Sequence, residues 1–235
     1  MNLKPSSKDI FGLAVENYFF KKDRTPISVH HADFYDDEIP VDYLFRTYKD
    51  MPELEQLALD LCRGRVLDVG CCAGSHSLEL KAKGHEILPI DISEKCIQTC
   101  RKRGLEEALQ MDFFELNQQK FDTILLLMNG IGIAQTLKNL PVFFQKLKAL
   151  MKPDSQVLLD SSDLIFLYED EILEEDAYYG EMKFKTSYKK QVSDSFPWLY
   201  LDFALLKTEA QKEGFQCELI YEDEHYSFLA KLGLS

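Results

Sequence analysis

Residues 66–74 read VLDVGCCAG, an apolar run that carries one acidic residue and opens into a glycine-containing turn. Apart from Asp68 the run is short and continuously apolar, which is typical of a strand buried in a parallel sheet. Gly70 and Gly74 suit a sharp turn, because glycine adopts backbone angles that other residues avoid. The next ten residues, SHSLELKAKG (75–84), predict a helix that ends in a glycine. The stretch therefore predicts a strand, a tight turn and a helix in succession.

The same alternation continues along the chain. Buried strands are predicted at 86–92, 121–130 and 155–162, a weaker strand at 106–112, and helices at 94–103 and 141–152. Strands that alternate with helices form a parallel sheet covered on both faces. Two later strands, 215–222 and 225–232, are joined by a short polar turn and predict an antiparallel hairpin. We therefore expect an α/β fold with a doubly wound, mostly parallel sheet and helices on both faces.

The organisation of the chain follows from where this pattern starts and stops. We expect an N-terminal cap or lid at 1–49, an α/β core at 50–163, a cap insertion at 164–198, and a C-terminal helix and hairpin at 199–235 that complete the core sheet. Within the insertion, the acidic run 169–176 predicts a solvent-facing helix and the alternating segment 182–190 predicts a strand.

The composition excludes several kinds of partner. The chain has 235 residues, 46% of them hydrophobic, which is enough for a core of its own. Its formal net charge of −13 disfavours a nucleic-acid backbone or an anionic membrane, because both bind basic surfaces. The longest apolar run, 124–128, is too short to span a bilayer, and residues 1–12 lack the apolar segment of a signal peptide. The six scattered cysteines are interpreted as reduced thiols. We expect a cytoplasmic protein that acts on a small molecule, and the oligomeric state stays open.

Other interpretations of the turn at 70–74 fit its residues less well. A nicotinamide-binding fingerprint would have glycine at 70, 72 and 75, whereas this chain has Cys72 and Ser75. Asp68 would also repel a pyrophosphate. Cys71 and Cys72 lack the spacing of zinc ligands, so we interpret them as small side chains of the core and expect no metal. An alternative role for Asp68 is that of a capping residue that stabilises the loop.

Asp68, Gly70 and Gly74 match motif I of the class I, Rossmann-like S-adenosylmethionine-dependent methyltransferases, in which an acidic residue precedes x-G-x-G-x-G. Cys72 replaces the middle glycine and keeps that residue small. The chain resembles the members of this family that act on small molecules. The resemblance implies a seven-stranded sheet in the order 3-2-1-4-5-7-6 with the last strand antiparallel. It also implies S-adenosyl-L-methionine as cofactor and S-adenosyl-L-homocysteine as product.

The resemblance extends to the ends of the next strands. Asp91 follows Asp68 by 23 residues, and a carboxylate is a natural acceptor for the two hydroxyls of a ribose. By resemblance, Asp112 meets the adenine amino group, the Phe113 amide contacts a ring nitrogen, and Ile92 packs on the face of the ring. These residues are the candidates for binding the nucleoside part of the cofactor.

The stretch FDTILLLMNGIG (121–132) resembles motif IV of the same family. Met128 and Asn129 would then lie beside the methionine moiety and the transferred methyl group. The implied reaction is an in-line displacement at the sulfonium methyl, for which the protein chiefly supplies alignment. Asn129 and His76 are the candidates for catalytic residues.

Several further side chains are candidates on their position alone. His76 lies at the positive end of the helix after motif I, where it would contact the cofactor carboxyl group or the acceptor. Arg46 suits bidentate binding of that carboxylate, and a surface salt bridge is the alternative. Asp160 and Ser161, at the end of strand 155–162, are expected to face the acceptor pocket.

The acceptor itself is not indicated by the sequence. Tyr35, Tyr43 and Tyr188 are candidates for aromatic walls of its pocket, with a core role as the alternative. The alternative function is that of an S-adenosylmethionine-binding protein that is non-catalytic or methylates a protein partner.

Overall fold

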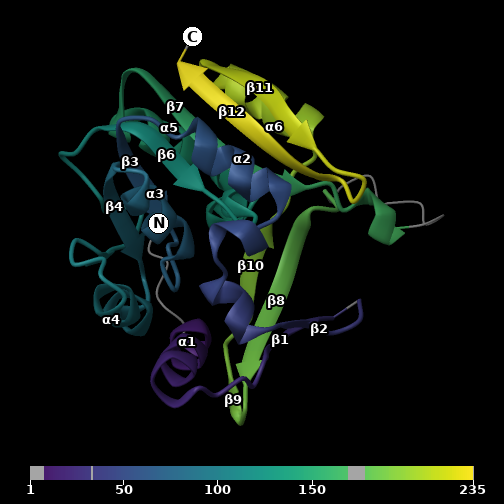
Figure 1. The fold of residues 1–235 in the computed structure, drawn as a ribbon. Coiled ribbons are helices and arrows are strands. Elements are labelled where there is room, and N and C mark those ends of the chain that lie inside the picture. Colours follow the sequence, from purple (N-terminus) through teal and green to yellow (C-terminus); the bar gives the residue numbers. More distant parts are fainter. Residues whose placement is uncertain (1–7, 33, 169–177, 235) are drawn as a thin grey trace. The chain divides into compact units, whose positions relative to one another are not determined.

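The computed structural model describes residues 8–32, 34–168 and 178–234, and its main feature is a seven-stranded mixed sheet (Figure 1). The strands in chain order are β3 Arg65–Val69, β4 Glu86–Asp91, β5 Leu109–Gln110, β6 Phe121–Leu126, β7 Met151–Ser162, β11 Phe215–Glu222 and β12 Ser227–Leu234. Their order in the sheet is β11-β12-β7-β6-β3-β4-β5. When these seven strands alone are numbered, the order from the β5 edge is 3-2-1-4-5-7-6, which confirms the expected topology.

The strand directions also agree with the sequence. β3 pairs in parallel with β4, β4 with β5, and β6 with β7. β12 runs antiparallel to both of its neighbours, β7 and β11, so the C-terminal hairpin completes the sheet as expected. Val66, Leu67 and the run Ile124–Leu126 are almost wholly buried, as continuous apolar strands of a covered sheet should be.

Helices and short helical turns connect these strands. The α-helices are α1 Ile10–Lys21, α2 Glu53–Leu61, α3 Ser75–Ala82, α4 Glu94–Lys102, α5 Leu140–Leu150 and α6 Phe203–Lys212. The 3₁₀ turns are η1 Val41–Phe45, η2 Tyr48–Asp50, η3 Gly130–Ala134, η4 Leu137–Asn139 and η5 Ile165–Tyr168.

Contacts divide the chain into two compact units, which are described separately. The first unit consists of Met1–Leu116 with Lys183–Phe196, and the second of Asn117–Met182 with Pro197–Ser235. The four segments expected from the sequence divide the chain by role rather than by contacts, and they stay a prediction.

In the first unit, the N-terminal segment packs on the helix that follows β4. At the start of α1, the Asp9 carboxylate accepts hydrogen bonds from Gly12 N at 2.8 Å and from the Ser93 hydroxyl at 2.5 Å. Lys95 of α4 pairs with Glu16 of α1 at 2.6 Å. The buried cluster beneath them comprises Ile10, Ala14, Val15, Ile27, Val41, Leu44, Ala73, Cys96 and Tyr188. Because Ala73 belongs to the motif I turn, the segment expected as a cap packs directly on that turn, and Tyr188 is a core residue.

A second, smaller sheet joins the two segments that were both expected to form the cap. Its strands are β1 Ile27–His31, β2 Asp37–Ile39, β8 Glu181–Tyr188, β9 Gln191–Val192 and β10 Phe196–Leu199. Their order is β10-β8-β1-β2, with β9 paired to β8. β1 and β8 are antiparallel, and Ser28 lies opposite Ser187. The strand expected at 182–190 therefore exists and pairs with a strand of the N-terminal segment.

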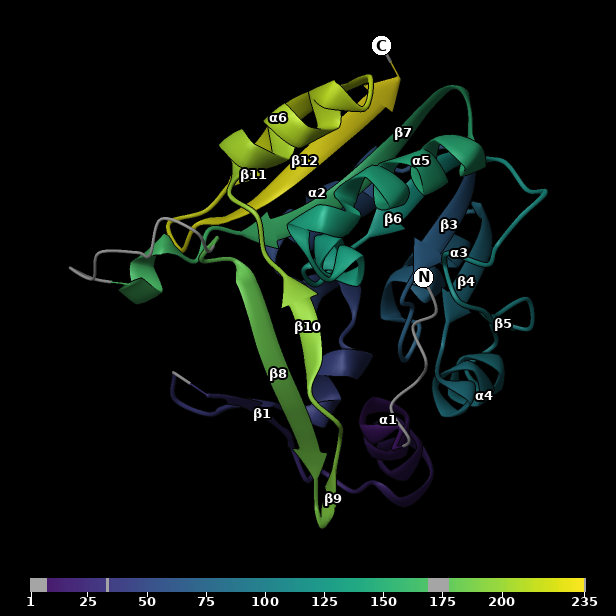
Figure 2. The same ribbon diagram turned by 180° about the vertical axis from the view of Figure 1, so that it is seen from behind.

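In the second unit, α5 and α6 lie on one face of the strands β7, β11 and β12 (Figure 2). The Phe144 ring of α5 contacts the Phe215 ring of β11 with 5.5 Å between centroids. Phe143, Phe144 and Phe215 are buried, and they anchor these elements to one another through apolar contact.

Two local expectations differ from the structure, and a third falls on residues that it does not describe. The strand expected at 106–112 is reduced to the two residues of β5, at an edge of the sheet. The strand expected at 121–130 ends at Leu126, and Met128 and Asn129 turn the chain away with left-handed backbone angles. The acidic run 169–176 lies outside the described residues.

Candidate active site

The turn between β3 and α3 is held in a left-handed conformation at three positions, Gly70, Cys72 and Gly74, with φ values of 75°, 49° and 83°. A Cβ atom on Gly70 would meet nothing within 4 Å, so this glycine faces open space. A Cβ atom on Gly74 would lie 2.5 Å from Leu105 Cδ1 and 3.0 Å from Cys100 Sγ. Gly70 therefore leaves room beside the turn, whereas Gly74 lets the helix that follows pack closely on its neighbours.

Asp91, at the end of β4, fixes this turn. Its carboxylate accepts hydrogen bonds from Cys72 N at 2.9 Å and from Ser93 N at 2.8 Å. Desolvation raises the pKa of Asp91 to about 6, the two amide donors oppose that rise, and the charges of Asp9 and Asp68 add to it. The side chain is half-buried and keeps oxygen lone pairs for further donors.

Asp68 lies below the turn and is 2% exposed. Its carboxylate accepts a hydrogen bond of 2.6 Å from the hydroxyl of Ser77, in the first turn of α3. Burial raises the pKa of Asp68, and the His76 side chain and the Ser77 hydrogen bond oppose that rise. The capping alternative is wrong, because the N-cap residue of α3 is Gly74 and no side chain caps that helix end. Asp68 instead holds α3 in place through Ser77.

The nucleoside-binding candidates surround an exposed apolar side chain. Ile92 is 38% exposed although it is a large hydrophobic residue, and it follows Asp91 directly. Met111 N donates to Asp91 O at 2.9 Å, which ties the end of β5 to the end of β4. The Asp112 carboxylate accepts from Phe114 N at 2.9 Å, and Phe113 is buried. An exposed apolar surface flanked by two carboxylates suits a planar, amine-bearing ring joined to a diol.

Arg46 and His76 meet at a third side chain that the sequence did not single out. Arg46 donates to Glu55 through Nε at 2.9 Å and through Nη2 at 2.5 Å, and His76 Nε2 lies 3.0 Å from Glu55 Oε2. The three side chains are only 3%, 5% and 11% exposed for Arg46, Glu55 and His76 respectively. The alternative of a surface salt bridge for Arg46 is therefore wrong, because its ion pair is buried. The cofactor role of Arg46 stays a prediction, and most of its N–H groups already have protein partners.

In the second unit, the segment after β6 forms a turn of unusual geometry. Met128 and Asn129 both have left-handed backbone angles, with φ values of 65° and 57°. Asp160 of β7 accepts hydrogen bonds from Met128 N at 3.1 Å and from Gly130 N at 3.0 Å. Met128 is 37% exposed. The carboxylate of Asp160 thus acts as a clamp across the turn.

The side chain of Asn129 is occupied at both ends. Its Nδ2 donates to Leu199 O at 3.1 Å, and its Oδ1 accepts from the Ser161 hydroxyl at 3.1 Å. The same Ser161 oxygen accepts from Leu201 N at 2.9 Å. Asn129 and Ser161 therefore tie the turn to the segment that leads into α6.

Further residues of the second unit escaped the sequence analysis. Tyr178 and Tyr179 donate to the carboxylates of Asp202 and Asp163, each at 2.8 Å. Burial and these acidic partners raise the pKa of both phenols. Trp198 lies against Gly132, where a Cβ atom would approach its ring to 2.1 Å. No local pattern marks these pairs, since their partners are distant in sequence.

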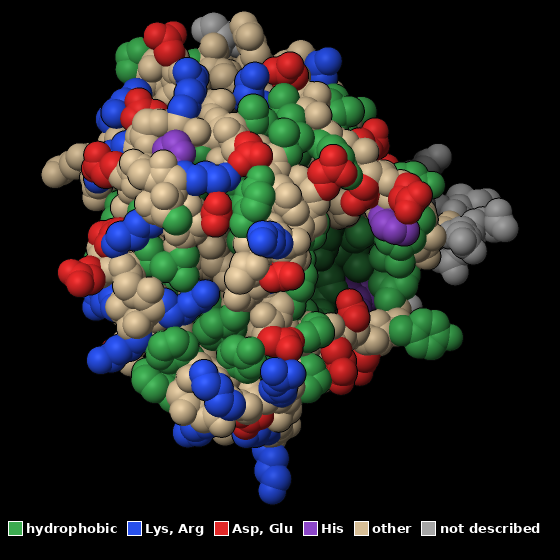
Figure 3. Space-filling view, in the orientation of Figure 1, with side chains coloured by type: hydrophobic (Ala, Val, Ile, Leu, Met, Phe, Trp, Pro, Cys, Tyr) green, Lys and Arg blue, Asp and Glu red, His purple; other side chains and the backbone are tan. Residues whose placement is uncertain are grey.

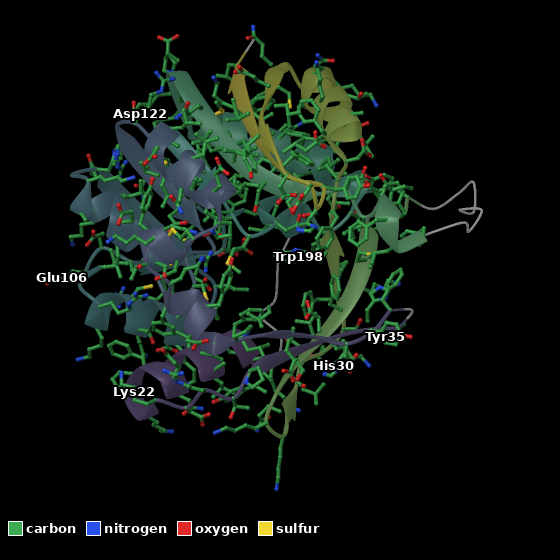
Figure 4. The ribbon with its side chains drawn as sticks, turned by 45° about the vertical axis from the view of Figure 1, so that its right-hand side comes forward. Lys22, His30, Tyr35, Glu106, Asp122 and Trp198 are labelled. Atoms are coloured by element: carbon green, nitrogen blue, oxygen red, sulfur yellow. The ribbon has the colours of Figure 1, made fainter. Side chains whose placement is uncertain are left out.

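The exposed fractions of Tyr35 and of the cysteines show where these remaining candidates lie. Tyr35, considered as a pocket wall, is fully exposed and points away from the molecule beside β1 and β2 (Figure 4), so that interpretation is wrong. All six cysteines are free, and Cys72 alone among them is half-buried rather than buried. Within the described residues, no group of three or more His, Cys, Asp or Glu side chains is arranged to hold a metal. In the same residues, no helix is both long and apolar enough to span a bilayer.

Comparison with known proteins decides the family. A family model described as a methyltransferase domain matches residues 63–218. A crystal structure of an S-adenosylmethionine-dependent methyltransferase from Bacteroides fragilis, in complex with S-adenosyl-L-homocysteine, is 43% identical over 100% of this chain and 98% of that chain, with a TM-score of 0.93. The chain belongs to the S-adenosylmethionine-dependent methyltransferases.

Curated relatives of this methyltransferase match over shorter stretches. The YqeM protein of Bacillus subtilis, named as a methyltransferase, is 26% identical over 104 residues, which is 42% of each chain. A ubiquinone biosynthesis O-methyltransferase of Xanthomonas oryzae is 38% identical over 55 residues, which is 23% of each chain. The methyltransferase thus matches less than half the length of these relatives. Its cofactor is S-adenosyl-L-methionine, and the nicotinamide alternative is excluded.

Proposed function

We propose that this methyltransferase transfers the methyl group of S-adenosyl-L-methionine to a small-molecule acceptor. The observation that carries the proposal is the packing of residues 8–48 on the motif I turn. The Ser75 hydroxyl donates to Leu44 O at 2.9 Å, and Ala73 is buried in one cluster with α1, β1 and η1 residues. A segment that covers the cofactor turn is suited to an enclosed acceptor and to the exclusion of water.

The charge of the protein supports the same acceptor class. Lys and Arg side chains are interspersed with Asp and Glu on the face seen in Figure 3, and the whole chain carries −13. A nucleic-acid acceptor would meet this charge with repulsion, because phosphate binding needs clustered cations. We therefore do not expect nucleic acids among the acceptors.

The residues of the first unit fit the cofactor. Asp91 would accept hydrogen bonds from the ribose hydroxyls, and Ile92 would pack on the adenine ring. Asp112 and the Phe113 amide would form hydrogen bonds with the edge of that ring. The open space beside Gly70 leaves room for the backbone to approach the cofactor. The uncapped start of α3 offers backbone N–H groups to the carboxylate of the methionine moiety. The cofactor supplies a methyl group already activated by its sulfonium.

In the second unit, Met128 would supply an apolar contact beside the reacting methyl. Because the Asn129 amide is hydrogen-bonded at both ends, we propose that Asn129 acts by holding this turn in shape rather than by contacting the acceptor. The contribution of the protein is then alignment of the acceptor with the methyl group and exclusion of water.

The proposal is tested by incubating the purified protein with S-adenosyl-L-methionine labelled in its methyl group. The acceptors are pools of phenols, catechols, amines and hydroxylated metabolites, with a protein lysate and total RNA as parallel acceptors. We expect label in the small-molecule fraction, lost in Asp91→Ala. Label confined to protein would support the alternative of a protein acceptor, and binding without any transfer would support the non-catalytic alternative. Either result would overturn the proposal.

A further inference from the structure

Three polar side chains from three separate segments meet in the interior of the first unit. Arg46 follows η1, Glu55 lies in the first turn of α2, and His76 is the second residue of α3, directly after motif I. Glu55 is the centre of the group, because its carboxylate contacts both of the others. A buried carboxylate is stable only when its lone pairs are used, and here Arg46 and His76 use them.

The charges in this group are balanced by Glu55. Burial opposes its ionisation, yet the hydrogen bonds from His76 and Arg46 hold the pKa of Glu55 below its ordinary value. Arg46 also donates through Nη1 to Tyr43 O at 2.8 Å, and its guanidinium stacks over the Tyr43 ring at 4.1 Å. Arg46 and Glu55 thus form a neutral, rigid pair against which the imidazole rests.

The hydrogen-bond roles on His76 follow from its partner. An ionised carboxylate only accepts, so the 3.0 Å contact with Glu55 places a hydrogen on His76 Nε2. With that hydrogen in place, the 3.3 Å approach of Arg46 Nη2 to the same nitrogen is a contact between two donors. In the neutral ring with its hydrogen on Nε2, the lone pair is on Nδ1, which makes no hydrogen bond within the described residues.

We propose that Glu55 is a positioning residue that fixes His76 in the Nε2–H form, so that Nδ1 accepts the proton of the methyl acceptor. The inference rests on the proposed function and narrows it to acceptors that must lose a proton, such as a hydroxyl or a protonated amine. As the acceptor lone pair bonds to the methyl carbon, the carbon–sulfur bond breaks and leaves neutral S-adenosyl-L-homocysteine. The acceptor proton moves to Nδ1 and from there to water, while Glu55 stabilises the transient imidazolium.

The placement of His76 supports this role. It lies at the start of the helix that follows the cofactor turn, and its side chain is 11% exposed rather than sealed. The charged groups that face it are Arg46, Glu55 and Asp68, from the segment after η1, α2 and β3. Glu55 holds the imidazole through Nε2 and leaves Nδ1 without a hydrogen bond within the described residues, which suits general-base catalysis.

The first test needs no acceptor. The ring nitrogens of His76 are followed by nuclear magnetic resonance in the protein saturated with S-adenosyl-L-homocysteine, in wild type and in Glu55→Gln. We expect the neutral wild-type ring to carry its hydrogen on Nε2, and the variant to show a mixture of the two neutral forms. A wild-type ring with its hydrogen on Nδ1 overturns the proposal. Glu53→Gln, an exposed change on the same helix, is the matched control.

The second test uses the acceptor found for the wild type. His76→Gln keeps a group that can donate to Glu55 but lacks the atom equivalent to Nδ1. We expect its kcat to fall at least 100-fold while its Kd for S-adenosyl-L-homocysteine changes less than threefold. In Glu55→Gln we expect the acid limb of the kcat profile to move to lower pH, because the imidazolium loses its stabilising carboxylate. An unchanged kcat in His76→Gln, or a loss of cofactor binding alone, overturns the proposal.

The two tests separate this inference from the proposed function. If the wild type methylates no small molecule, the proposed function fails, whereas the resonance experiment still decides the form of His76. If transfer occurs and both variants match the wild type, the proposed function stands and the role of Glu55 fails. Should Glu55→Gln not fold, His76→Gln decides the kinetic part. His76→Asn, whose amide lies near the position of Nδ1 but cannot take up a proton, is expected to lose as much of kcat.

Discussion

The carboxylate of Asp91 already accepts two backbone N–H groups, and a ribose would add two hydroxyl donors. An ionised carboxylate has about four acceptor sites, so the four donors can be met together. When the carboxyl is protonated, one of its oxygens becomes a donor and an acceptor site is lost. Cofactor binding is therefore linked to the ionisation of this one group, whose pKa is raised to about 6 by desolvation.

We predict that affinity for S-adenosyl-L-homocysteine decreases as the pH falls through about 6. Because the folded pKa lies above its ordinary value, the carboxylate is ionised above about pH 6 and protonated below it. The Kd should be level between pH 7 and pH 8 and then rise by about tenfold per pH unit at most, as the loss of one ionised group allows. Calorimetric titration from pH 5 to 8 measures this. In Asp91→Asn the Kd should be higher and independent of pH, and a wild-type Kd that is flat down to pH 5 would contradict the assignment.

Gly74 and Gly84 differ in how closely other atoms pack around them. Gly74→Ala should lower the free energy of unfolding by about 2–5 kcal/mol, since a left-handed backbone costs alanine about 1–2 kcal/mol and overpacking adds about 1–3 kcal/mol. Gly84→Ala should cost only the backbone part, about 1–2 kcal/mol. Both have large positive φ, but a Cβ on Gly84 meets nothing within 4 Å. Urea unfolding of the two variants compares them, and equal losses would refute the packing argument.

Which residues the sequence predicted depends on how local their signal is. Asp68, Gly70, Gly74 and Asp91 lie at fixed distances within one strand–turn–helix–strand succession, so spacing alone made them candidates. Glu55 lies 21 residues before His76 in a helix where an acidic residue is expected to face solvent, yet it is 4% exposed. A buried polar partner that is brought in from another helix leaves no periodic mark in the sequence.

At the scale of elements, the turn after β6 illustrates strain balanced by hydrogen bonds. Two consecutive non-glycine residues, Met128 and Asn129, are left-handed, and each such residue costs about 1–2 kcal/mol. Asp160 compensates by accepting from both sides of the turn. Strain that the surroundings hold in place is characteristic of functional turns, which agrees with the resemblance of this stretch to motif IV.

We predict that Asp160→Asn loosens this turn. The asparagine amide would replace one acceptor oxygen by a donor group facing a backbone N–H. The turn would lose one of two hydrogen bonds that are exposed or partly buried, and such a bond contributes about 0.5–1.5 kcal/mol. We expect lower stability of that order and at least a tenfold loss of kcat, with a smaller change in the Kd for S-adenosyl-L-homocysteine. Denaturant unfolding and steady-state kinetics measure both. Asp154→Asn, at an exposed position of the same strand, is the control, and a variant with normal kcat would show that the clamp is dispensable.

The elements themselves were predictable where they repeat and less so where they pair at long range. Alternating apolar strands and helices predicted a mostly parallel sheet, and the resemblance to the family predicted the order of its strands. The pairing of β1 with β8 joins residues that are more than 150 positions apart, such as Ser28 and Ser187, and no local pattern contains that pairing. The length of the strand expected at 106–112 was overestimated. Only Leu109 and Gln110 form β5, and they pair with Ile90 and Asp91 at the edge of the sheet.

At the scale of the whole molecule, charge is the property that the sequence determines directly. The excess of acidic residues follows from counting, and it holds whatever the fold. Acceptor specificity behaves in the opposite way, because it depends on side chains from separate segments that converge only in the folded chain. The family and the cofactor could therefore be predicted from the sequence. For the acceptor, the only inference comes from the geometry around His76.

The net charge leads to a prediction about association rates. S-adenosyl-L-methionine carries a net positive charge through its sulfonium, whereas S-adenosyl-L-homocysteine is neutral overall. A protein of charge −13 should attract the cofactor from solution and leave the product unaffected. Raising the ionic strength from about 0.01 M to 0.15 M shortens the screening length from about 30 Å to 8 Å.

We therefore expect the association rate constant of S-adenosyl-L-methionine to fall several-fold over that range of salt, while that of S-adenosyl-L-homocysteine changes less than twofold. Stopped-flow fluorescence with both ligands measures the two rates, and the neutral product is the internal control because it binds the same site. Equal salt dependence for the two ligands would contradict this prediction, because the protein exerts no net attraction on a neutral ligand.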